Sequence, residues 1–413
     1  MFKYLLLLSV LVPLIGVFQM EGGAYGASIG IYGYQNGVTK IYAVYAVIML
    51  STFFTITTQW KLPKIQGCSD LGQRYRPFAL LTGFFILLML AMMLFGFGAY
   101  RVWLGEIGKG AFRANLGTFG AVAYLSIKSV IPTLVVFLSI LYMSSKKTRK
   151  DKILLFTIFV LTVVVGSTWG FKTTGLTMLL PAMIILYWNA SAIKIGKIFL
   201  FFIAITTLFF QMYDVGVETQ MNALNFLWTR TTTMQGDVSW YIWDQYSNGV
   251  QFPSYSKTLL PFIGDNIFSL ITGISRLDQE LWAEYHFDIL INYLVGLPLD
   301  VVEIGHSIVG TPFSEGLILG GVPGVVLMAL LGGTISAGIY SRIHSSVLRN
   351  RPYVASIYAT YLGVHMLSWL IGGAIIQLIH ISVIIGLLVS YFICLLFSSL
   401  LSRRWGLSKP GIA

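Results

Sequence analysis

Residues able to do acid–base chemistry are concentrated in one polar stretch of this 413-residue sequence, residues 214–315. The stretch holds twelve of the sixteen carboxylates in the chain. Its densest part is rich in glycines that allow tight turns, and it contains His306, Thr311, Ser314 and Glu315. A histidine and a carboxylate in such a setting can activate a hydroxyl group as general bases or hold it by hydrogen bonds. The alternative is that Ser314 and Glu315 only cap the helix that follows.

Basic residues near the ends of apolar runs form the second set of candidates. Arg230 follows the seventh apolar run, and Arg276 follows a short apolar segment inside the polar stretch. A guanidinium group at headgroup level can bind a pyrophosphate through two parallel hydrogen bonds. Lys172 lies in the turn between the fifth and sixth runs, beside a helix start that favours anions. Lys128 lies well inside the fourth run, where an unpaired ammonium group is costly, so we expect it to line a cavity.

Other titratable residues point to no further chemistry. Asp278 and Glu280 form a short acidic pattern that can hold a divalent cation, but such pairs arise often by chance, so no metal and no other cofactor is expected. His344, His365 and His380 lie in or beside apolar runs and are interpreted as structural. The sequence contains no P-loop, dinucleotide-binding fingerprint, HExxH or GxSxG motif. The site must therefore be inferred from charge and position.

The elements that position these residues are predicted to be membrane helices. The chain is 56% hydrophobic and only 10% charged, far from the roughly 25% charged residues of a globular protein. Ten apolar runs are long enough to cross a bilayer at about 20 residues each. They lie near residues 4–19, 41–60, 77–100, 118–143, 153–169, 173–190, 198–213, 316–340, 353–372 and 378–400. The first is expected to be a retained signal-anchor helix, with a cleaved signal peptide as the alternative.

The sequence thus predicts an all-α polytopic membrane protein in three parts. Residues 1–213 form seven transmembrane helices with short loops, residues 214–315 form a large loop, and residues 316–413 form three more helices and a tail. In this topology eighteen of the twenty-seven lysines and arginines fall on one side, which the positive-inside rule assigns to the cytoplasm. Both termini are then cytoplasmic and the large loop is outside. Because the basic residues serve topology, the net charge of +11 does not indicate nucleic-acid binding.

The large loop is expected to lie against the membrane. Its segments 258–274 and 287–299 are apolar but too short to span, which predicts helices on the bilayer or partly in it. Its first half is crowded with the aromatic residues Trp228, Trp240, Tyr241, Trp243, Tyr246, Phe252 and Tyr255. At this depth they indicate a membrane-interface belt, with a platform for stacking sugar rings as the alternative. The outward-facing Lys40, Lys109 and Lys257 are expected to reach for water or to pair with loop carboxylates.

Three of these features together resemble the Wzy-type polymerases, the integral membrane enzymes that polymerise O-antigen and related polysaccharide repeat units. They are the basic turn with Lys172, the Thr-Arg pair at Arg230 that opens the outer loop, and the stretch from His306 through Glu315 to a Gly-Gly pair before a helix. The resemblance covers roughly residues 150–340 and the hydropathy profile, and it implies a GT-C-like fold. The sequence departs from the family at Lys172, where relatives commonly carry an arginine, so a point-charge contact replaces a bidentate one.

The resemblance implies glycosyl transfer at the periplasmic face of a bacterial inner membrane. The donor would be a glycan on undecaprenyl pyrophosphate, and the acceptor a sugar hydroxyl of a second lipid-linked repeat unit. Lys172, Arg230 and Arg276 would hold the pyrophosphate, and Arg230 would also assist catalysis by stabilising the leaving group. Oriented cations can stabilise this developing charge without a metal.

The same resemblance implies roles for the remaining candidates. Arg101 and Arg113, in the outer loop after the third helix, would bind the pyrophosphate of the acceptor. His306 or Glu315 would deprotonate or orient the attacking hydroxyl, and Thr311 would contact substrate. A chain-length regulator protein is an expected partner.

Two other functions compete with this interpretation. An O-antigen ligase would use the same donor but deliver the glycan to lipid A core, and its architecture is similar. A transporter of polysaccharide or lipid would do no covalent chemistry, and would be expected to have inverted repeats and broken helices with ionisable residues at the bilayer midplane. The sequence contains no convincing internal repeat.

Overall fold

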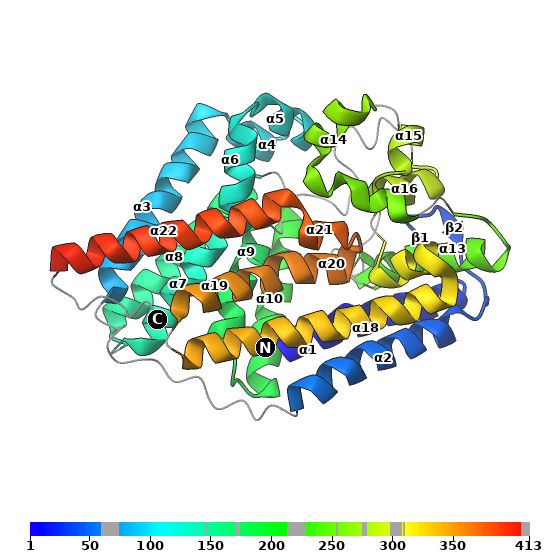
Figure 1. The fold of residues 1–413 in the computed structure, drawn as a ribbon, viewed down its shortest axis with the longest axis horizontal. Coiled ribbons are helices and arrows are strands. Elements are labelled where there is room, and N and C mark those ends of the chain that lie inside the picture. Colours follow the sequence, from blue (N-terminus) through cyan, green and yellow to red (C-terminus); the bar gives the residue numbers. More distant parts are fainter. Residues whose placement is uncertain are drawn as a thin grey trace.

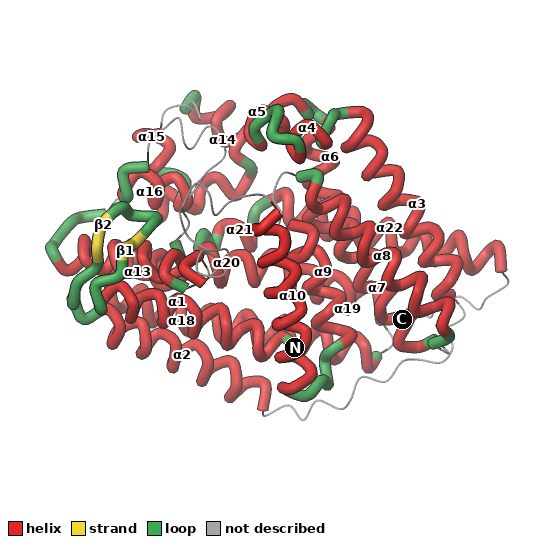
Figure 2. The backbone as a smooth tube through the Cα atoms, turned by 180° about the vertical axis from the view of Figure 1, so that it is seen from behind, coloured by secondary structure: helices red, strands yellow, loops and turns green. Residues whose placement is uncertain are grey.

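The computed structural model describes residues 1–58, 74–145, 147–169, 174–212, 228–230, 232–252, 255–274, 279–297, 308, 310–349 and 351–405. These residues form an almost entirely helical protein, as predicted. The described strands are β1 (Tyr25–Gly26) and β2 (Ile31–Tyr32), which pair antiparallel with Tyr25 opposite Tyr32 and Gly26 opposite Ile31. Figure 2 shows this small hairpin at one end of the helical body, beside α13 (Thr233–Ser247).

Seven stretches of the described chain are long and apolar enough to cross a membrane. They contain α1 (Phe2–Glu21), α2 (Val38–Thr58), α3 (Tyr75–Ala91) with η2 (Met92–Gly96), α6 (Phe119–Leu125) with η3 (Ser126–Val130) and α7 (Ile131–Ser144), α18 (Pro312–Leu348), α19 (Pro352–Thr360) with η5 (Tyr361–Met366) and α20 (Leu367–Gly372), and α21 (Ile376–Ile379) with α22 (Ile381–Trp405). The membrane character predicted from composition is therefore supported by helices of the required length.

The three remaining predicted runs also coincide with helices, namely α8 (Arg149–Ser167), α9 (Thr174–Leu186) and α10 (Ala192–Met212). Helix α9 has only 13 residues, shorter than the hydrocarbon core requires. Helix α8 opens with four consecutive charged residues, Arg149, Lys150, Asp151 and Lys152. The number of membrane crossings thus remains a prediction, and so does the outer location of the large loop.

The other described helices are short and lie in the connections. They are α4 (Tyr100–Trp103), α5 (Lys109–Asn115), η4 (Tyr255–Ile263), α14 (Asp265–Thr272), α15 (Gln279–Ala283) and α16 (Phe287–Leu294). The predicted apolar segment 258–274 is divided at Gly264, whose φ of 103° ends one helix before the next begins. Helix α14 exposes Leu270 and Ile271 at 85% and 70%, which suits a helix lying at an apolar boundary.

Helices α18, α1 and α2 lie side by side along one edge of the molecule (Figure 1). Helix α13 crosses α1 at Gly16 and Gly236, where the two backbones touch. A side chain at either position would collide with the backbone of the other helix. Small residues allow this approach, as they do between membrane helices generally. Residues 233–247 of the large loop are therefore part of the packed helical body.

Helix α18 bends sharply near its start. Gly320 and Gly321 have non-helical backbone angles, and Gly321 has a φ of 61°, which L-residues with side chains rarely adopt. The bend folds the first two turns back, so that a Cβ on Gly316 would lie 2.7 Å from Cα of Val325. The tyrosine ring of Tyr246 fills the space beside Gly321. The Gly-Gly pair seen in the sequence thus orients the short segment that carries Glu315.

Contacts between segments far apart in the sequence show which segments lie at each end of the helical body. The N-terminal amine of Met1 donates to the carbonyl of Tyr187, and Trp188 stacks on Tyr340 with ring centroids 4.1 Å apart. These segments were all predicted to lie on the cytoplasmic side. At the other end Ser28 contacts Asp237, and both belong to segments predicted to lie outside.

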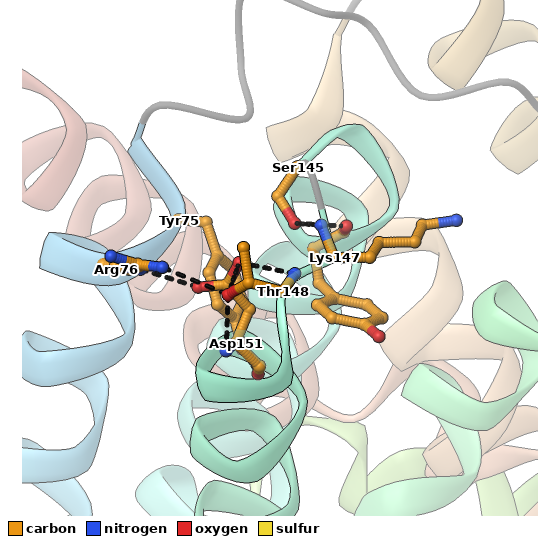
Figure 3. A network of polar contacts seen from close by, with 7 residues as sticks. Tyr75, Arg76, Ser145, Lys147, Thr148 and Asp151 are labelled. Carbon is orange, nitrogen blue, oxygen red and sulfur yellow. Dashed lines mark hydrogen bonds and ion pairs between the residues drawn. The ribbon is translucent and has the colours of Figure 1, made fainter.

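A polar network fastens α3 to the start of α8 at the first of these ends (Figure 3). Arg76 forms an ion pair of 2.7 Å with Asp151, and the Tyr75 hydroxyl donates to the carbonyl of Asp151. Thr148 and Asp151 form a capping box on α8. Burial alone would raise the pKa of Asp151, but the ion pair with Arg76 and the hydrogen bonds from Thr148 hold it below its ordinary value.

Candidate functional site

Glu315 lies in the first turn of α18 and is 1% exposed. One carboxylate oxygen accepts a hydrogen bond of 2.8 Å from the indole nitrogen of Trp369, and the other accepts one of 2.7 Å from the backbone N–H of Ile375. Buried hydrogen bonds to a charged group are among the strongest in proteins. Glu315 therefore fastens the start of α18 to the junction between α20 and α21.

That junction is an irregular stretch of backbone between two helices. Gly373 and Ala374 have φ angles of 69° and 61°, so the chain leaves the helix and Ile375 offers its N–H to a partner outside it. A Cβ on Gly373 would lie 2.6 Å from the ring of Phe287 and 3.3 Å from the backbone of Thr311. The start of α18, the junction and α16 therefore meet at one place.

A cluster of buried hydroxyl groups lies beside Glu315. Ser239 of α13 is 2.8 Å from the Thr311 hydroxyl and 3.1 Å from the Ser314 hydroxyl. Thr311 is the N-cap of α18, because its side chain accepts from the N–H of Ser314. The N-capping side chain is thus that of Thr311 rather than Ser314. Glu315 lies in the first turn of the helix, as the capping alternative expected, and its side chain also bonds to neighbouring elements.

Helix α13 is held at this place by its own carboxylates. Asp237 accepts hydrogen bonds from the backbone N–H groups of Ser28 and Val238, and its burial raises its pKa to about 6. Asp244 accepts a bond of 2.6 Å from the Tyr34 hydroxyl and raises the pKa of that tyrosine. The N-terminal hairpin and α13 are therefore one structural unit.

One of the aromatic residues on α13 corrects the sequence interpretation. Trp240 is fully buried and donates to the carbonyl of Tyr34, whereas Trp243 is partly exposed and donates to the carbonyl of Asn36. The buried ring of Trp240, with its indole N–H already bonded, serves neither a membrane belt nor a sugar platform. Only tertiary packing of the N-terminal loop over α13 reveals this. Trp228, by contrast, is 56% exposed.

Arg101 and Arg113 lie in the short helices that follow η2. Arg101 is exposed and forms an ion pair of 3.0 Å with Glu106. Arg113 donates to the carbonyl of Trp169 at 3.3 Å and lies over its ring at 5.5 Å, and burial lowers its pKa. Since Trp169 precedes Lys172 by three residues, Arg113 lies beside the end of the helix that leads into the predicted basic turn.

Several predicted site residues fall outside the described part of the chain: Lys172, Arg276, Asp278 and His306. The same holds for the side chain of Glu280. Arg230 is described and exposed, in the short helical turn before α13. Lys257 pairs with Glu284, as expected for an outward lysine with a loop carboxylate.

The structure therefore brings together Glu315 and Thr311, and it places Arg101 and Arg113 in a separate group of short helices. Within the residues that the structure describes, no group of three histidines, cysteines or carboxylates could hold a metal ion. The sequence reasoning missed Ser239 and Trp369, which contact these residues. A serine in a loop and a tryptophan in an apolar run carry no periodic or motif signal that marks them as partners.

Comparison of this chain with protein-family models, with curated proteins and with solved structures finds no match.

Proposed function

We propose that this protein is an integral membrane glycosyltransferase that polymerises undecaprenyl-pyrophosphate-linked oligosaccharide repeat units. The observation that carries the proposal is Glu315, a buried carboxylate that joins two interrupted membrane helices beside a polar cluster. Charged groups at such places are costly and usually functional. The sequence resemblance through Lys172, Arg230 and Glu315 supplies the reaction class.

In the proposed reaction the hydroxyl oxygen of the acceptor attacks the anomeric carbon of the donor glycan. The bond from that carbon to the pyrophosphate breaks, its electron pair leaves with the lipid pyrophosphate, and the hydroxyl proton passes to a base. Arg230, Lys172 and Arg276 are the proposed cations for the leaving group. Both oxygens of Glu315 already accept hydrogen bonds, which favours orientation of the acceptor by Glu315 and proton transfer to His306.

We further propose that both termini lie in the cytoplasm of a bacterial cell and that the site faces the periplasm. The supporting observations are the basic residues near one end of the helical body and the contact of Met1 with Tyr187 there. The short helices η4 and α14 to α16 would then form a cap on the outer surface of the inner membrane.

The test is surface polysaccharide profiling by gel electrophoresis in a host that lacks the gene, complemented with wild type, Glu315→Gln or Arg230→Ala. Glu284→Gln is the matched control, because this carboxylate is paired with Lys257 outside the proposed site. Membrane levels of every variant are measured in parallel. We expect deletion, Glu315→Gln and Arg230→Ala to leave lipid core with a single repeat unit, whereas wild type and Glu284→Gln restore the ladder.

Two outcomes would contradict the proposal. Bare lipid core with long lipid-linked chains retained inside would make the protein a ligase. A normal ladder in the deletion host would remove the polymerase assignment altogether.

A further inference from the structure

Lys128 is a cation inside a membrane-spanning stretch. It lies in the π-turn η3, between Ile127 and Ser129, both of which are fully buried, and it is itself partly exposed. It follows Phe119, the start of the spanning stretch, by nine residues, or about 14 Å along a helix. An ammonium group at this depth requires a compensating partner.

A second polar side chain lies in the spanning helix that packs against η3. His365 lies in another π-turn, η5, which contacts η3. It is 6% exposed, and its Nε2 has no hydrogen-bond partner among the described residues. Single π-turns inside α-helices occur frequently at functional sites, and two of them face one another here.

Arg113 adds a further positive charge to the same region. It lies over the ring of Trp169 at 5.5 Å, and that ring lies 6.0 Å from the ring of Tyr124, about one helical turn before Lys128. The carboxylates whose side chains the structure describes have partners elsewhere: Glu21 with Gly37, Glu106 with Arg101, Asp151 with Arg76, Asp237 with Ser28, Asp244 with Tyr34, Glu284 with Lys257, and Glu315 with Trp369. No ion pair to Lys128 is formed within this part of the chain.

We propose that Lys128 and His365, with Arg113 at the rim, form an internal binding site for a phosphoryl group. Two neighbouring cations in a poorly solvated region are neutralised by a dianionic group, and a phosphate carries about 1.5 to 2 negative charges whereas a carboxylate or chloride carries one. Its oxygens accept from an ammonium group, a guanidinium group and an imidazole N–H alike.

The position of this site relates it to Glu315. His365 and Trp369 are four residues apart on one spanning helix, so they lie roughly one turn apart on the same side. His365 contributes to the phosphoryl site, and Trp369 donates to Glu315. The inference rests on the proposed function in one respect. In the proposed polymerase, the phosphoryl group belongs to a lipid-linked diphosphate that is held next to the reaction site.

Thermal unfolding of the purified full-length protein in detergent micelles tests this site without any turnover. The probes are inorganic pyrophosphate, inorganic phosphate and undecaprenyl phosphate, each compared with sodium chloride at matched ionic strength. A ligand that binds only the folded protein raises the apparent Tm with concentration, which yields an apparent Kd. The variants are Lys128→Met, Lys128→Arg and His365→Gln, and the control is Lys40→Met, which removes an exposed lysine.

We expect wild type and Lys40→Met to be stabilised by a phosphorylated probe, and Lys128→Arg to retain most of the effect. Lys128→Met should raise the apparent Kd on the order of thirtyfold or more, because a charge partner in a poorly solvated region is removed. Stabilisation by inorganic pyrophosphate or phosphate identifies the bare group as sufficient, and stabilisation only by undecaprenyl phosphate identifies a lipid headgroup. Either supports the site.

No stabilisation of wild type by any of the three probes would overturn the inference, and so would an unchanged Kd in Lys128→Met. If that variant does not fold, an unchanged Kd in His365→Gln has the same force. Failure of the polymer assay with intact phosphate binding would remove the proposed function and leave this site in place.

Discussion

The double hydrogen bond of Glu315 leads to a quantitative prediction about stability. In Glu315→Gln one oxygen becomes an NH2 group, which cannot accept, so either Trp369 Nε1–H or the N–H of Ile375 faces another donor. One hydrogen bond to a charged group, about 1.5 to 3 kcal/mol, is lost, and a buried donor is left unsatisfied. Part of this cost is offset, because the neutral amide is easier to bury than the carboxylate. We therefore expect the free energy of unfolding to fall by about 2 to 4 kcal/mol.

Double-mutant analysis isolates the contact itself. Trp369→Phe keeps the ring and removes the indole donor, so its combination with Glu315→Gln measures the coupling between the two side chains. We expect a coupling energy of about 1.5 to 3 kcal/mol, measured by unfolding in mixed detergent–SDS micelles with Glu284→Gln as the control. A Glu315→Gln protein as stable as wild type would refute the connection between α18 and the α20–α21 junction, because either orientation of the amide removes one of the two hydrogen bonds.

Three further predictions concern other parts of the fold. Because burial raises the pKa of Asp237 to about 6, the folded state holds its proton more tightly than the unfolded state, so stability should fall by up to about 3 kcal/mol as the pH rises from about 4 through 6. Asp237→Asn should flatten this part of the pH–Tm profile. A profile unchanged by the substitution would contradict the assignment of this pH dependence to Asp237. Gly236→Ala should force α13 away from α1 and destabilise by about 3 kcal/mol, whereas Gly338→Ala, where a Cβ meets nothing, should have little effect in the same thermal assay. The pKa of Asp151 is held below its ordinary value, so the stability from its contacts with Arg76 should be present above about pH 4 and lost as the pH falls further. Asp151→Asn should lower the free energy of unfolding by about 1 kcal/mol near neutral pH. Equal melting temperatures of this variant and wild type would contradict the prediction.

The helices were predictable from the sequence because their signal is local. A run of about 20 apolar residues favours a membrane helix wherever it lies in the chain, and each of the ten predicted runs coincides with a described helix. The short helices of segments 258–274 and 287–299 follow from the same local signal. The glycine pair at 320–321 also marks the bend in α18, because positive φ is a property of a single residue.

The partners of the site residues were not predictable, because they are contacts between segments far apart in sequence. Glu315 was a candidate from its residue type and position alone, but only packing brings Trp369 and the N–H of Ile375 to its two oxygens. Trp240 was placed in a membrane belt by the aromatic composition of its segment, whereas the loop around Tyr34 covers it. The sequence by itself determines which residues leave water, since that depends on hydrophobicity and length. Tertiary structure decides which buried polar groups meet, since each is satisfied only by a partner that folding delivers.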